Sequence, residues 1–251
     1  MKKNNTIFKN QIQLYLKMLL AFLVLYVLAI GVSFVSQYYK ILTFQVEEVS
    51  YLFVLFLFVI IWVNLAKEIT FYSYQSMTRK EILYQSMTAQ LLICFLASIV
   101  IEGINQLIFR LDISNFTIHS DAIRIVYLKE FKLNMYLEIF LAILILTIGL
   151  FTVSQIANAI AIATYSWKLS KLLIVLSSLL IILVALIVSF SFWTRSMYVY
   201  FVKALGWLSG TGQHIVPTIT IPIVLMLLVL VLSMMFEVKK IKKIEINKFI
   251  A

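Results

Sequence analysis

The chain has 251 residues, of which 63% are hydrophobic and 13% charged, and its formal net charge is +10. Soluble domains hold roughly 45–50% apolar residues, and a soluble fold as apolar as this one would expose large hydrophobic patches. The composition therefore excludes an ordinary soluble domain and predicts an all-α polytopic membrane protein.

Six stretches are long and apolar enough to be transmembrane helices, each of which needs about 20 mainly apolar residues. The alternation typical of transmembrane barrel strands is absent from the sequence. We expect one transmembrane domain that covers residues 1–251. The predicted spans are 16–37, 50–66, 86–109, 134–160, 170–193 and 216–236.

A polar lead-in precedes the first span and has the period of an amphipathic helix. Its apolar and polar side chains fall on different faces. The apolar face carries Phe8, Ile12, Tyr15 and Leu19, and the polar face carries Lys9, Gln13 and Lys17. We predict an N-terminal helix that lies along the membrane surface before the first span turns inward. A frayed polar tail is the alternative.

The basic residues predict the orientation, because cytoplasmic loops carry an excess of Lys and Arg. With six spans both termini share a side, and 14 of the 21 Lys and Arg residues fall on that side. This bias predicts that both termini are cytoplasmic. The positive charge is spread over membrane flanks instead of a soluble module, so it requires no nucleic-acid partner.

Polar side chains inside the predicted spans are candidates for function, because they are costly in hydrocarbon. They are Glu102, Glu138, Asn64, Gln155 and Asn158. The two carboxylates are interpreted either as interfacial partners of Arg110 or Lys132, or as the outer mouth of a substrate path. The three amides fit either helix–helix hydrogen bonds or the same path.

Two further segments indicate contact with lipid. Residues 194–215 are rich in aromatic side chains and contain three glycines near their end. Trp and Tyr prefer the headgroup level, so we predict a short outer-leaflet helix between spans five and six. The C-terminal tail from Lys239 to Lys248 is basic, which favours contact with anionic lipids; an ordinary stop-transfer flank is the alternative.

Catalytic motifs are missing from the sequence. Cys94 is the only cysteine and lies in the third predicted span, where it fits a small core side chain. His119 and His214 lie in unrelated loops, and no familiar metal-binding pattern includes them. The phosphate-binding loop of nucleotide hydrolases is also missing. We therefore predict that the chain is not an enzyme and binds no cofactor or metal itself.

The stretch S-M-T-R-K-E-I-L at residues 76–83 follows the second span. It resembles the G-x-[ST]-R-[KR]-x-[IF] element of type-two ABC exporter permeases, and the six-span layout resembles that superfamily over nearly the whole chain. Ser76 stands where the family usually has Gly. Small Firmicute permeases for peptide or bacteriocin export, or for immunity, are the members it resembles most.

The resemblance implies a cytoplasmic coupling helix between spans two and three that docks on a separate ABC ATPase subunit. It would be formed by Phe71, Tyr72, Tyr74, Met77, Thr78, Arg79, Lys80 and Glu81. ATP and Mg²⁺ would bind to that partner, and a second permease copy or a related permease would complete the assembly in the bacterial cytoplasmic membrane. The cargo would be an amphipathic peptide, a toxin or a lipid-like molecule.

Two alternatives to this function remain open. An ordinary positive-inside loop would explain the same basic residues without an ATPase contact. The whole chain would then fit a non-transporting membrane component, such as an immunity, sensor or substrate-capture protein that works by binding.

Overall fold

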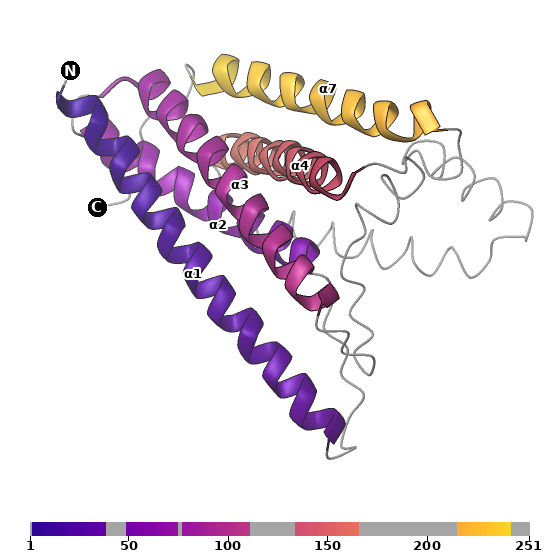
Figure 1. Ribbon diagram of the computed structural model, residues 1–251. Helices are drawn as coiled ribbons and strands as arrows, with labels where there is room; N and C mark the ends of the chain where they lie inside the picture. The colour runs from indigo at the N-terminus through magenta and orange to yellow at the C-terminus, as the bar shows by residue number, and fades with distance from the viewer. Residues whose placement is uncertain (1, 39–48, 75–76, 111–133, 166–214, 242–251) are drawn as a thin grey trace, which may run out of the picture.

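The computed structural model describes residues 2–38, 49–74, 77–110, 134–165 and 215–241, and every regular element in these ranges is an α-helix. The long helices reflect long apolar runs, one of which contains Pro222 in its interior. Their bounds are α1 Lys2–Tyr38, α2 Val49–Tyr74, α3 Arg79–Arg110, α4 Met135–Thr164 and α7 Ile215–Ile241 (Figure 1).

All five described helices are long and apolar enough to cross a membrane, as judged by length and composition. The candidate spans within them are Phe8–Val32, Leu52–Tyr72, Arg79–Leu107, Met135–Thr164 and Pro222–Ile241. Each overlaps one predicted span, so the all-helical fold is confirmed for these five, and each is a helix that could cross a membrane. The predicted span 170–193 lies outside the described residues. The predicted outer-leaflet segment 194–215 also lies outside them, except for its last residue, Ile215.

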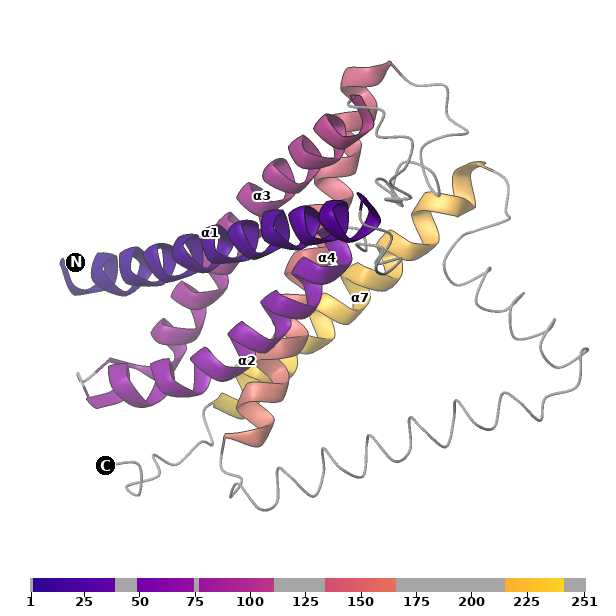
Figure 2. The ribbon, with the colours of Figure 1, turned by 90° about the horizontal axis from the view of Figure 1, so that it is seen from below.

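The helix α4 lies in the middle of the bundle and contacts α2, α3 and α7, while α1 packs mainly on α3. Figure 2 shows α4 between α2 and α7, with α1 crossing in front of α3. The early residues of α4 and α7 share one apolar cluster and their late residues share another, so these two helices run in the same direction. The predicted topology requires this of spans four and six.

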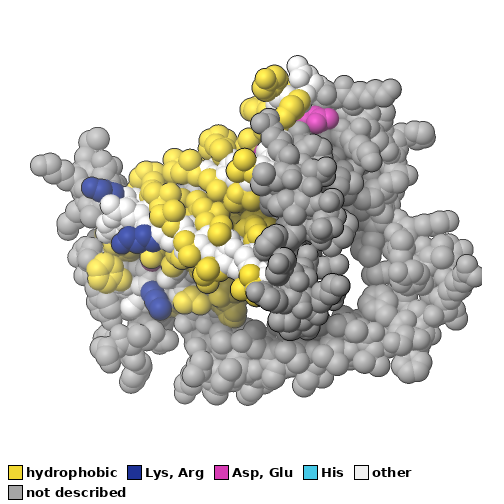
Figure 3. Space-filling model, turned by 60° about the horizontal axis from the view of Figure 1, so that its bottom comes forward, with side chains coloured by type: hydrophobic (Ala, Val, Ile, Leu, Met, Phe, Trp, Pro, Cys, Tyr) yellow, Lys and Arg dark blue, Asp and Glu magenta, His cyan; other side chains and the backbone are white. Residues whose placement is uncertain are grey.

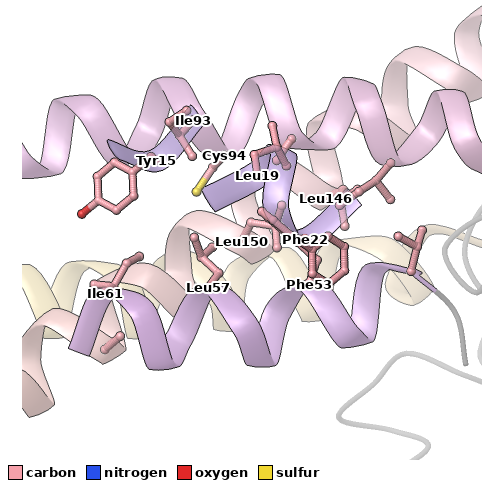
Figure 4. Packing of buried hydrophobic residues seen from close by; sticks show 14 of the residues in the cluster. Tyr15, Leu19, Phe22, Phe53, Leu57, Ile61, Ile93, Cys94, Leu146 and Leu150 are labelled. Carbon is pink, nitrogen blue, oxygen red and sulfur yellow. The ribbon is translucent and has the colours of Figure 1, made fainter. Parts of the chain in front are cut away.

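The largest core cluster joins α1, α2, α3 and α4 through apolar side chains. Phe22 of α1 meets Phe53 of α2 in an edge-to-face contact with ring centroids 5.1 Å apart. Leu150 of α4 and Ile93 of α3 pack into the same cluster (Figure 4). In a membrane this close packing stabilises the helix contacts, because the lipid itself is as apolar as the side chains.

The N-terminal lead-in differs from its prediction as a separate surface helix. Residues 2–38 form one continuous helix, so the lead-in runs straight into the first span. The predicted apolar face is present, but it faces the protein: Tyr15 and Leu19 belong to the core, and Phe8 and Ile12 pack against it. The amphipathic period therefore reports helix–helix packing in this segment.

Within the described residues, no separate coupling helix lies between α2 and α3. The helix α2 continues to Tyr74 and α3 begins at Arg79, so most of the residues assigned to the coupling helix belong to these two long helices. The aromatic residues assigned to a coupling helix extend the end of α2, and the R-K-E residues form the first turn of α3. The two helices form a helical hairpin.

Candidate functional site

The basic side chains of the described residues gather in one half of the bundle. The late residues of α2, α4 and α7 and the early residues of α3 share a cluster there, which includes Leu65, Leu83, Ile162 and Ile241. Figure 3 shows Lys and Arg side chains along one edge of the visible face, next to an apolar surface. The exposed lysines of this half are Lys9, Lys17, Lys67, Lys80, Lys239 and Lys240. We call it the basic end; it matches the side predicted to be cytoplasmic.

The turn between α2 and α3 lies at this basic end and is fixed at both sides. The backbone N–H of Met77 donates to the carbonyl of Tyr72 at 3.3 Å, a bond of the type that closes a helix in a Schellman turn. At the start of α3, the N–H of Glu81 donates to Oγ1 of Thr78 at 3.3 Å, and the N–H of Thr78 donates to Oε2 of Glu81 at 3.2 Å. This reciprocal pair is a capping box, and it satisfies backbone donors that the first turn of a helix leaves free.

The side chains predicted to contact an ATPase divide into an inner and an outer set. Tyr72 is buried in the apolar cluster at the basic end, and Met77 packs half-buried against it. Phe71 is 58% exposed, and its ring lies edge-on to that of Tyr72 with centroids 5.1 Å apart.

The outer set also contains Thr78, Lys80 and Glu81, which are exposed, whereas Arg79 is half-buried. Tyr74 is the last residue of α2, and its side chain lies outside the described part. We call Phe71 together with residues 77–81 the hairpin tip. It presents the exposed ring of Phe71 and the exposed side chain of Lys80 at the basic end.

A buried amide cluster joins three helices deeper in the bundle. Gln155 and Asn158 of α4, both predicted from the sequence as polar candidates, donate to Oε1 of Gln90 on α3 at 3.1 and 2.8 Å. Nε2 of Gln90 lies 3.1 Å from Oδ1 of Asn158 and 3.3 Å from the hydroxyl of Tyr15 on α1. All four side chains are buried. Their hydrogen bonds satisfy one another, so the cluster holds α1, α3 and α4 together.

Neither Gln90 nor the role of Tyr15 in this cluster was predicted from the sequence. The signal was present, because Gln90 is a long polar side chain within the predicted span 86–109. A second missed contact lies nearer the basic end, where Nε2 of Gln11 on α1 donates to Oε2 of the buried Glu68 on α2 at 2.7 Å. Gln11 lies one helical turn before Tyr15 on the inward face of α1.

The other predicted polar residues lie apart from the amide cluster. Nδ2 of Asn64 lies 3.9 Å from the sulfur of Met18 in the contact of α2 with α1. Glu102 is 4% exposed and accepts a 2.7 Å hydrogen bond from Nε2 of Gln106. It follows Gln90 by 12 residues, which is about 18 Å along α3.

The half-buried Glu138 stands in the first turn of α4, at the end from which the helix runs towards Asn158. The 20 residues between these two side chains correspond to about 30 Å of helix. The structure therefore does not bring the predicted path residues into one site. Among the described residues, no group of three His, Cys, Asp or Glu side chains is arranged to hold a metal ion.

No family model, no curated protein and no solved structure matches this chain. The hairpin tip and the amide cluster are thus defined by their own geometry. The tip is exposed, capped and close to basic side chains, which suits contact with another protein. The amide cluster is sealed and internally satisfied, which suits a structural contact.

Proposed function

We propose that the chain is the transmembrane permease subunit of an ATP-driven ABC exporter in the bacterial cytoplasmic membrane. A separate cytoplasmic ATPase would bind ATP and Mg²⁺ and dock on the hairpin tip. A second copy of the chain, or a related permease, would complete the assembly within the lipid bilayer. The exported cargo would be an amphipathic peptide, a toxin or a lipid-like molecule.

The observation that carries this proposal is the form of the hairpin tip. A membrane subunit that receives its energy from a separate ATPase needs an exposed element to which the ATPase can bind. This element must also move together with the transmembrane helices. Phe71 is an exposed aromatic ring of the kind that anchors protein interfaces, and Lys80 adds a charge that can orient docking. The capping box ties this surface to the first turn of α3.

The long helices support transmission of such a movement. The hairpin tip is continuous with α2 and α3, which have 26 and 32 residues. Displacement at the tip would therefore act on both helices along their full length. The amide cluster begins about 16 Å from Arg79 along α3, and it would pass a shift of α3 to α1 and α4.

The geometry also favours a second candidate for one reason. Gln155 and Asn158 are buried and donate their amide hydrogen bonds to Gln90, so they do not offer polar groups to a moving cargo. A non-transporting membrane component that works by binding would need only the stable bundle. Such a protein would tolerate changes at Phe71 and Lys80, which separates the two candidates.

Affinity purification of the tagged chain from its native membranes, with mass spectrometry of the bound proteins, tests the proposal. We expect an ATPase that carries a phosphate-binding loop to co-purify in stoichiometric amount. Phe71→Ala and Lys80→Glu should reduce its recovery at least tenfold. The matched control is Lys239→Glu, which reverses an exposed lysine at the same basic end but on α7. Recovery of the chain without any ATPase, in a folded state, would favour the binding component.

A further inference from the structure

Glu237 occupies an unusual position near the end of α7. Its side chain is 0% exposed, and both carboxyl oxygens are buried without a hydrogen-bond partner in the part of the chain that the structure describes. It shares a helix face with Met234 and Ile241, which lie three residues before and four residues after it. Ile241 belongs to the apolar cluster of the basic end, and Met234 packs against that cluster.

No described side chain offers the carboxyl group of Glu237 a hydrogen bond. The titratable side chains in the parts of α3, α4 and α7 that form the basic end are Arg79, Lys80, Glu81 and Tyr84 on α3, Tyr165 on α4, and Lys239 and Lys240 on α7. Tyr165 shares a 2.8 Å hydrogen bond with Thr70, and Glu81 belongs to the capping box. Both lysines of α7 are exposed. Within the described ranges, the carboxyl of Glu237 thus gives up its hydration and gains no polar contact in return.

Burial of a polar group without a partner opposes the contact that buries it, whether the group is charged or neutral. The span in α7 is the least buried of the five candidate spans: 11% of its window is buried, against 50% of the window in α3. It packs chiefly on α4 and only slightly on α3. The contact with α4 must therefore offset the cost of Glu237, while most of the α7 span surface adds no burial.

We propose that Glu237 destabilises the docked position of α7, and that α7 has a second position in which this carboxyl reaches water at the basic end. The group lies four residues, or about 6 Å, before the last residue of α7, so movement of only the last turn of α7 away from α4 is enough to expose it. The helix α7 is then the movable element of the bundle, held by apolar contacts and opposed by one buried carboxyl. This inference is independent of the proposed ATPase partner.

Removal of the carboxyl tests the proposal, because it predicts a gain of stability where most core substitutions cause a loss. In the purified full-length protein, Glu237→Met should raise the midpoint of thermal unfolding by about 2–4 °C or more. Hydrogen exchange of the backbone amides in 234–241 should slow down in this variant, because α7 then stays in its docked position. Glu237→Gln removes the charge and keeps the shape, and it should raise the midpoint less than Glu237→Met.

The matched control is Glu102→Met, which replaces the buried carboxylate that accepts a hydrogen bond from Gln106. This change should lower the unfolding midpoint. If Glu237→Met also lowers it, or if exchange in 234–241 becomes faster, the carboxyl has a stabilising partner and the proposal is wrong. If Glu237→Met does not fold, the exchange of the wild type decides: equal protection of the ends of α4 and α7 would contradict a movable α7.

Discussion

Gln90 and Asn158 exchange two amide hydrogen bonds across the contact between α3 and α4. Nε2 of Gln90 donates to Oδ1 of Asn158 at 3.1 Å, and Nδ2 of Asn158 donates to Oε1 of Gln90 at 2.8 Å. Both side chains are buried, so each amide replaces the hydration of the other. The pair fixes the register of two antiparallel helices, because a shift by one residue would separate the amides.

Replacement of Gln90 by leucine should destabilise the bundle. It leaves the amides of Asn158 and Gln155 without their shared partner, at a cost of about 1–2 kcal/mol. The measurement is thermal or chemical unfolding of the purified protein in detergent. The double variant Gln90→Leu with Asn158→Leu should recover part of the loss, because it removes both ends of the contact. The exposed Gln13 provides the control, and Gln13→Leu should change stability by less than about 0.5 kcal/mol.

The capping box predicts a local effect at the hairpin tip. Thr78→Ala removes the side-chain acceptor of the Glu81 N–H and should cost about 1 kcal/mol. Hydrogen exchange should rise in the first turn of α3 and stay unchanged in α4. Thr78→Ser keeps the hydroxyl group and should keep the protection. Equal exchange in the alanine and serine variants would show that the capping box does not hold the turn.

The hydrogen bond between Gln11 and Glu68 predicts that the start of α1 depends on α2. Gln11→Leu removes the donor to a buried carboxyl oxygen, so we expect a loss of about 1–3 kcal/mol. Proteolysis near the N-terminus should become faster in this variant, because the end of α1 is less firmly held. Gln13→Leu again serves as the exposed control. Unchanged stability in both variants would mean that α1 is held by its apolar face alone.

The fold itself predicts which residues lie on opposite sides of the membrane. Tyr136, near the start of α4, is 81% exposed, and Lys80 is exposed at the basic end. In a Cys94→Ala background, a membrane-impermeant thiol reagent should label Tyr136→Cys in intact cells and Lys80→Cys only after lysis. Labelling of Lys80→Cys in intact cells would overturn the orientation derived from the basic residues.

The helices were predictable because a membrane restricts the chain to long apolar helices, and five of the six predicted spans correspond to described helices. Polar residues at inward positions were harder to interpret. A lone Gln90 in an apolar run shows that some partner exists, but only the packing of α3 against α4 and α1 reveals which one. The face of α1 was predicted correctly, while its neighbour was taken to be lipid instead of protein.

At the hairpin tip, too, the sequence alone did not reveal which side chains are buried and which are exposed. The sequence T-R-K-E fits both a capping box and a docking motif, since a Thr followed three residues later by Glu starts many helices. The aromatic residues before it were all assigned to the element that docks on the ATPase. The structure places Tyr72 in the core and leaves Phe71 outside, although the two are neighbours in the chain. Adjacent residues on a helix point about 100° apart, so their roles depend on how α2 is rotated in the bundle.

Photo-cross-linking from the hairpin tip tests the proposed function most directly. A photoreactive phenylalanine analogue is placed at Phe71, which is 58% exposed, and separately at Phe95, which is 49% exposed in the middle of α3. We predict that the analogue at position 71 cross-links to a cytoplasmic ATPase subunit in native cells, and that the analogue at position 95 does not. A folded, membrane-inserted protein that gives no ATPase cross-link from position 71 would contradict the account of this chain as an ATP-driven permease subunit.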